Sequence, residues 1–160
     1  MAFYLNAIVG SLAALQRQRD RYANARVIPL THGFAIIPLT SNLRRELDPT
    51  AQDVGYDSSA IDEDSGQLTA WLQDISRDEA VAYVEAQFFG DAGGQEAIVW
   101  RDGEVVLEPV KSSTYGPINE ALRLLGVPID PAQSDEFDTL GLGRHRRTDQ
   151  WVEGRRLPRR

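Results

Sequence analysis

The chain has 160 residues, of which 42% are hydrophobic and 26% are charged, as expected for one globular domain that can bury a core. The absence of cysteine excludes disulfides, zinc-thiolate sites, iron–sulfur clusters and thiol nucleophiles. Two histidines and a formal net charge of −7 leave few acid–base relays or metal sites to consider.

The charges are unevenly distributed along the chain. Residues 144–160 contain seven arginines and two acids, a net charge of +5, so residues 1–143 carry −12. Residues 46–76 contain eight acids and no basic residue. We therefore expect a single globular domain over 1–143 and a basic C-terminal tail over 144–160 that docks on the body or on a partner chain.

The first third of the chain reads as strands around one helix. Strands are predicted over 2–9, 27–30 and 34–39, and a helix is predicted over 12–23. A short helix should end near Leu47, and residues 48–66, rich in Pro, Gly, Ser and Asp, should form a long acidic loop.

The second half begins with an amphipathic helix whose apolar residues lie at i, i+3, i+4 and i+7 from Leu68. Residues 76–79 match a capping box, which favours a helix, but 80–89 are rich in strand formers and we interpret them as a strand. A glycine-rich loop over 90–94 should follow. The later predicted elements are a hairpin over 97–107 with Asp102-Gly103 at its turn, a helix opening at 115–117, and a short helix after Ser134.

This order, β-α-β-β, acidic loop, α, β-β-β, α-α, predicts an α+β fold. We expect one mixed or mainly antiparallel sheet with helices packed on one face.

Gly93-Gly94-Gln95 resembles the Gly-Gly-Gln tripeptide of class I release factors and related peptidyl-tRNA hydrolases, in which the glycines let the backbone enter a tight site. The resemblance covers only the tripeptide. Asp91 and Glu96 flank it, whereas a loop that faces RNA needs cations. We therefore interpret it as a glycine loop that joins two strands.

Three further groups of residues could carry chemistry. Glu85 and Glu104 could meet across the sheet as an acid–base pair, although a solvated sheet face explains them equally. His32 could join Thr31 in a relay, but we expect a surface turn residue. His145 lies among arginines and should belong to the basic tail.

The acidic loop and the tail are the two candidate interaction sites. In the loop the candidate residues are Asp53, Asp57, Asp62, Glu63 and Asp64. In the tail they are Arg144, Arg146, Arg147, Trp151, Arg155 and Arg156. The tail arginines could pair with body carboxylates, or could contact phosphates and bases together with Trp151.

We expect a non-enzymatic binding protein, without a cofactor or metal, whose partner has a basic surface. The charge is analogous to that of inhibitors of basic nucleases, including immunity proteins. Self-association through the tail is a second way to satisfy the same charges. The alternatives are a carboxylate- or divalent-metal-dependent enzyme that uses the loop 48–66, and nucleic-acid binding through the tail. With no cysteine, no basic leader and no apolar run of about 20 residues, we expect a cytoplasmic protein without a membrane span.

Overall fold

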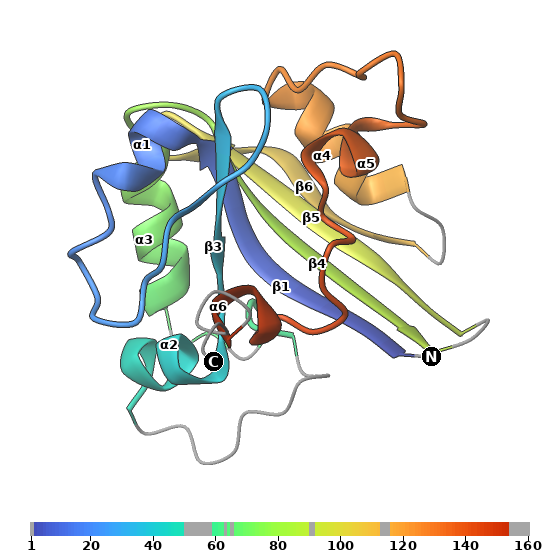
Figure 1. The fold of residues 1–160 in the computed structure, drawn as a ribbon. Helices are drawn as coiled ribbons and strands as arrows, with labels where there is room; N and C mark the ends of the chain where they lie inside the picture. The colour runs from blue at the N-terminus through green and yellow to red at the C-terminus, as the bar shows by residue number, and fades with distance from the viewer. Residues whose placement is uncertain are drawn as a thin grey trace, which may run out of the picture.

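The computed structural model describes residues 2–49, 59–62, 64, 66–89, 92–112 and 116–153. A six-stranded antiparallel sheet forms its centre, with the strand order β2-β3-β1-β4-β5-β6 (Figure 1). The strands are β1 (Ala2–Ser11), β2 (Ile28–Pro29), β3 (Phe34–Pro38), β4 (Val81–Phe89), β5 (Ala92–Arg101) and β6 (Glu104–Ser112). The α+β class with one antiparallel sheet is therefore confirmed.

Six helices complete the described part of the chain. They are α1 (Leu12–Gln16), α2 (Ser41–Leu47), α3 (Gln67–Ser76), α4 (Gly116–Leu124), α5 (Glu136–Leu140) and α6 (Gln150–Glu153). The helix predicted over 12–23 ends at Gln16, and the chain continues through turns as far as Ala25. Residues 81–89 form a strand, as interpreted from their composition.

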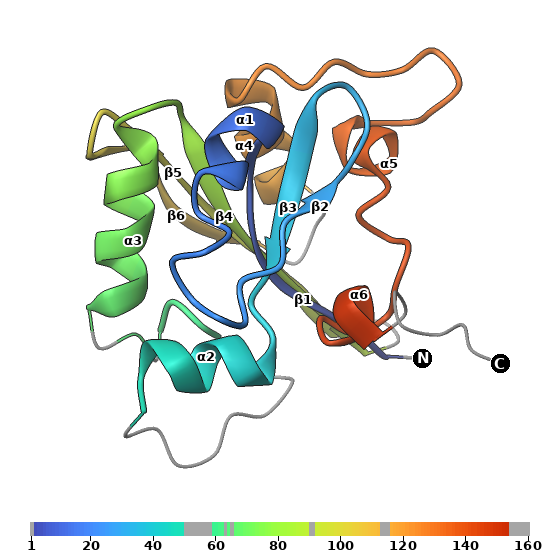
Figure 2. The same ribbon diagram turned by 60° about the vertical axis from the view of Figure 1, so that its left-hand side comes forward.

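The helices lie on both faces of the sheet, so the prediction of one covered face is wrong. Figures 1 and 2 show α1, α2 and α3 on one side and α4 and α5 on the other. Successive strand residues point to opposite faces, and both sets are buried. In β4, Val81 and Tyr83 pack with α3, whereas Ala82 and Val84 pack with α4 and Trp151. We call these the α3 face and the α4 face.

Two tight turns need left-handed backbone. Asp102 and Gly103 join β5 to β6 with φ of 55° and 80°, as the Asp-Gly pair predicts. His32 and Gly33 join β2 to β3 with φ of 59° and 80°. His32 is exposed in that turn, as expected for a surface turn residue.

The first part of the basic tail is integrated into the sheet. The Tyr4 amide donates to the Arg146 carbonyl at 2.8 Å, and the Asn6 amide donates to the Thr148 hydroxyl at 3.0 Å. Both amides lie on the part of β1 that does not pair with β3. Residues 146–148 therefore bond to the edge of β1 that a longer β3 would have covered. Trp151 is 1% exposed in the core of the α4 face. Residues 144–153 are therefore held by backbone bonds and apolar burial.

Among the described residues, no helix is long and apolar enough to cross a bilayer.

Candidate functional site

A pocket of about 400 Å³ lies where β4 and β5 approach their hairpin connection. Its lining comes from three neighbouring strands: Glu85 and Gln87 of β4, Gly93, Gly94, Gln95 and Glu96 of β5, and Ser112 of β6. Along the α3 face, the apolar pair Tyr83–Ile98 is followed by the pairs Glu85–Glu96 and Gln87–Gly94. The buried core thus passes directly into a polar hollow, which we call the carboxylate pocket.

Two carboxylates face each other across the carboxylate pocket. Glu85 and Glu96 occupy directly opposite register positions on β4 and β5, so both side chains leave the sheet on the same face. The predicted pairing of Glu85 with Glu104 is wrong, because Glu104 pairs with Arg101 at the other end of β5. On its other side, Glu96 lies opposite Lys111 of β6 in the register.

Glu85 is held in one orientation by hydroxyl groups. Ser59 and Tyr83 both donate to its Oε1, at 2.6 Å and 2.8 Å. No described residue donates to Oε2. The Tyr83 hydroxyl lies 2.8 Å from Asn6 Oδ1, which also accepts the Ala60 amide at 3.1 Å. Burial, and then the charge of Glu85, raise the pKa of Tyr83 well above its usual value, so the phenol stays protonated.

The glycines of the pocket form part of a strand and not the predicted loop. Gly93 and Gly94 lie in β5, opposite Phe88 and Gln87. Gly93 has φ of 118°, and a Cβ there would overlap the carbonyl oxygen of Gln87, so only glycine fits. Gln95 points to the α4 face, where its Oε1 accepts the Ile118 amide of α4 at 3.0 Å. Its contacts therefore do not resemble those of an exposed catalytic loop.

The predicted acidic-loop residues have different positions. Asp53, Asp57 and Glu63 lie outside the described residues. Asp64 is used structurally: its carboxylate accepts the amides of Gly66, Leu68 and Thr69 and the Thr69 hydroxyl, and so caps α3. Asp62 lies in the turn that follows Ser59, whose hydroxyl accepts the Asp62 amide. Within the described ranges, no group of three potential ligands could hold a metal ion.

Of the predicted tail residues, Arg155 and Arg156 lie outside the described residues. Arg144, Arg146 and Arg147 are exposed. The Arg144 guanidinium lies over the buried Trp151 ring at 5.0 Å, and the His145 ring meets that ring edge-on at 4.9 Å. Burial and the charge of Arg144 lower the pKa of His145, which favours the neutral ring at neutral pH.

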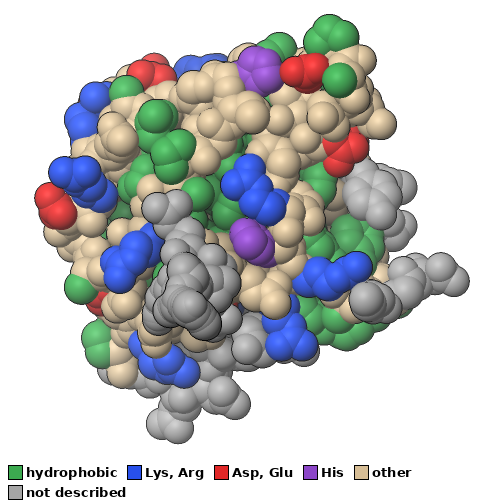
Figure 3. Space-filling model, in the orientation of Figure 1, with side chains coloured by type: hydrophobic (Ala, Val, Ile, Leu, Met, Phe, Trp, Pro, Cys, Tyr) green, Lys and Arg blue, Asp and Glu red, His purple; other side chains and the backbone are tan. Residues whose placement is uncertain are grey.

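Residues 144–153 run across the face that is turned to the viewer in Figure 1. Figure 3 shows the same face, and on its described part basic side chains lie in the middle and at the rim, whereas acidic ones lie towards the rim. We define the C-terminal basic surface as the exposed residues Arg144, Arg146 and Arg147.

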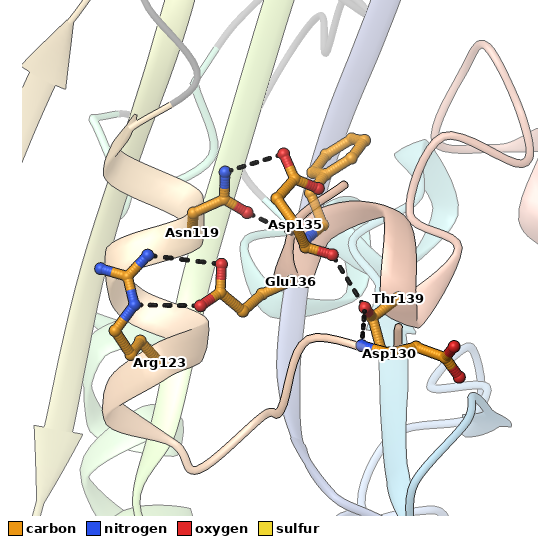
Figure 4. A network of polar contacts seen from close by, with 7 residues as sticks. Asn119, Arg123, Asp130, Asp135, Glu136 and Thr139 are labelled. Carbon is orange, nitrogen blue, oxygen red and sulfur yellow. Dashed lines mark hydrogen bonds and ion pairs between the residues drawn. The ribbon is translucent and has the colours of Figure 1, made fainter. Parts of the chain in front are cut away.

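A second group of carboxylates, between α4 and α5, is structural (Figure 4). Glu136 is 2% exposed and accepts two bonds from Arg123, at 2.9 Å and 3.4 Å. Asn119 bridges the two helices, because it donates to Asp135 and accepts the Phe137 amide. The described contacts satisfy these groups, so this network explains how α5 is attached to α4 and offers no open site.

Comparison with protein-family models, curated proteins and solved structures finds no match to this chain.

Proposed function

We propose that this protein binds a partner protein with a basic surface, and that the carboxylate pocket receives a cationic side chain of that partner. The single observation that carries the proposal is Glu85, held by two hydroxyl groups at the wall of an open hollow of about 400 Å³ that Glu96 also lines. A guanidinium group has donors arranged in a fork, which suits two carboxylates on adjacent strands. An arginine side chain is therefore the ligand that fits this chemistry best.

The net charge of the chain supports the same proposal. The chain carries −7, and Ser59, which donates to Glu85, belongs to residues 46–76, whose net charge is −8. A net negative charge attracts cationic groups and speeds their association. Because Glu85 is already oriented by two hydroxyls, little side-chain entropy is lost when a ligand binds its Oε2.

Binding of a blocked arginine tetrapeptide, followed by calorimetry, tests the proposal. The double variant Glu85→Gln/Glu96→Gln keeps the shape of the pocket and removes its charge, so we expect affinity to fall by on the order of tenfold or more. Glu104→Gln is the single-charge control, since Glu104 is exposed at the far end of β5 and β6. Equal losses in the double variant and the control would show that general acidity, not the pocket, attracts the peptide.

A second candidate, a carboxylate-dependent enzyme, is favoured by one contact. The Ser59 hydroxyl lies 2.6 Å from Glu85 Oε1, a geometry in which a carboxylate can activate a nucleophile. The divalent-metal form of this candidate predicts that Mg²⁺, Mn²⁺ or Ca²⁺ raises the melting temperature of the wild type but not of Glu85→Gln. Unchanged melting with all three ions would remove the metal-dependent form.

A further inference from the structure

We propose that the outer edge of β6 receives an extended segment of a partner protein, which pairs with residues 104–108 and adds a strand to the six-stranded sheet. The segment carries apolar side chains against Val105 and Val106 and a lysine or arginine opposite Glu108. The inference goes beyond the proposed function, because it concerns the edge of the sheet and does not need the carboxylate pocket.

β6 is the last strand of the sheet, and its outer edge is open along residues 104–108 (Figure 1). Part of the backbone N–H and C=O groups of such a strand point away from its neighbour, here β5. Among the described residues, none outside β5 makes a hydrogen bond to the backbone of residues 104–108. An edge of this kind can pair with an extended peptide, which is the contact used in β-strand addition.

The opposite side of the sheet does not offer such an edge. β2 consists of two residues, and Pro29 has no backbone N–H to donate. The part of β1 that does not pair with β3 is covered by residues 146–148, which bond to the Tyr4 and Asn6 amides. In the described part of the fold, residues 104–108 are therefore the stretch of edge best able to accept a strand.

Two adjacent valines are exposed on this edge. Val105 is 39% exposed and Val106 is 45% exposed. A β-branched side chain stabilises a sheet when an apolar residue of the neighbouring strand lies beside it, and the contact removes apolar area from water. Apolar residues of the added segment therefore gain contacts with these two valines.

Glu108 selects the charge of the segment. Its side chain is exposed, and no residue of β5 lies opposite it in the register. Glu104, by contrast, lies directly opposite Arg101, so its charge already has a counterpart. Because opposite charges at facing positions stabilise strand pairing and like charges oppose it, the residue that faces Glu108 should be lysine or arginine.

The same features disfavour a second copy of this chain as the occupant. Another copy brings its own Glu108 and a net charge of −7 to this edge. The register shifts between Ala97 and Val99 and between Val99 and Trp100 bend and twist the pairing of β6 with β5. Such irregularities and edge charges hinder the pairing of two folded sheets, whereas a single extended segment can follow a twisted edge.

Nuclear magnetic resonance with the blocked hexapeptide Thr-Lys-Val-Val-Lys-Thr tests the inference on the full chain. Titration should shift the amide signals of residues 104–108 and slow the exchange of their outward N–H groups with solvent. The peptide with both lysines replaced by glutamate should bind at least about threefold more weakly, because its charges oppose Glu108. The lysine peptide with an N-methylated backbone should not bind, because it cannot donate hydrogen bonds to the edge.

A charge reversal shows whether Glu108 makes the selection. Glu108→Lys should reverse the preference, so that the glutamate peptide binds more tightly than the lysine peptide. Asp20→Lys makes the same change at an exposed position in the turns that follow α1, which packs on β1 and β3, and should keep the preference for lysine. Circular dichroism melting checks that both variants fold. If Glu108→Lys does not fold, Glu108→Gln takes its place and should abolish the preference.

Amide signals of residues 104–108 that the lysine peptide does not shift would overturn the inference. A preference that the Glu108 variant leaves unchanged, or equal binding of the N-methylated peptide, would overturn it too. The arginine tetrapeptide and the pocket variant Glu85→Gln/Glu96→Gln separate the two proposals. If this variant loses the tetrapeptide and keeps the hexapeptide, both proposals stand. If the hexapeptide is lost with it, the edge proposal is wrong, and if the wild type binds only the hexapeptide, the proposed function is wrong.

Discussion

Replacing Trp151 with alanine tests whether residues 144–153 are part of the folded domain. Trp151 is 1% exposed and packs in the core of the α4 face against residues from the sheet and α4. Burial of such a side chain removes roughly 150–250 Å² from water, and truncation of a buried tryptophan costs about 3–5 kcal/mol. Because a domain is stable by only about 5–15 kcal/mol, we expect Trp151→Ala to lose a large fraction of that stability.

Urea unfolding followed by circular dichroism measures this loss without relying on tryptophan emission. With a slope of about 1–3 kcal/mol/M, the midpoint should fall by roughly 2 M. Leu124→Ala is the control, since Leu124 is 41% exposed and should cost no more than about 0.5 kcal/mol. A Trp151→Ala midpoint no lower than that of the control would refute the integration of this segment.

Three further substitutions test other features of the fold. Gly93→Ala forces a side chain into a backbone at φ of 118° against the facing strand, and circular dichroism should show a protein that melts far earlier or does not fold. Burial tends to raise the pKa of Glu46, but bonds from Asn24 and from the Ala23 amide outweigh it and lower that pKa. Its stabilisation is therefore present above about pH 4.5 and lost as the pH falls through the folded pKa, so Glu46→Gln should flatten the acid side of a stability–pH profile. Arg123→Gln should lower the free energy of unfolding by more than the roughly 1 kcal/mol typical of an exposed ion pair, because it leaves the buried Glu136 carboxylate with weaker bonds. A urea midpoint lower than that of Arg17→Gln, which breaks an exposed pair, would show this.

The strands were more predictable than the layers around them. Two sequence signals conflict here: the capping box at 76–79 favours a helix, whereas the composition of residues 80–89 favours a strand. The structure shows why the capping box misleads. Ser76 is the last residue of α3, and its hydroxyl accepts the Gly103 amide in the β5–β6 turn, a contact that tertiary structure alone provides. The strand interpretation succeeded because five of the nine residues of β4 are β-branched or aromatic, namely Val81, Tyr83, Val84, Phe88 and Phe89.

The burial of both sheet faces is visible in the sequence as unbroken apolar runs. A sheet with one wet face alternates polar and apolar residues, whereas Ala35-Ile36-Ile37 and Val81-Ala82-Tyr83-Val84 are unbroken apolar runs. Such runs indicate burial on both sides, which the structure confirms for both segments. The tail was harder to place, because the bonds that hold 146–148 depend on where β3 ends relative to β1.

The carboxylate pair depends on the register of a single hairpin. The predicted loop over 90–94 does not define which residue of β4 lies opposite Glu96. In the structure Phe89 pairs with Ala92, and that register places Glu85 opposite Glu96. A shift of one residue would send one carboxylate to the α4 face and leave the other alone. Gly93 opposes this shift, because its left-handed backbone passes against the Gln87 carbonyl where no other residue fits. The glycine pattern that resembled a catalytic loop therefore has a structural role, which is to fix the pairing on which the acidity of the pocket depends.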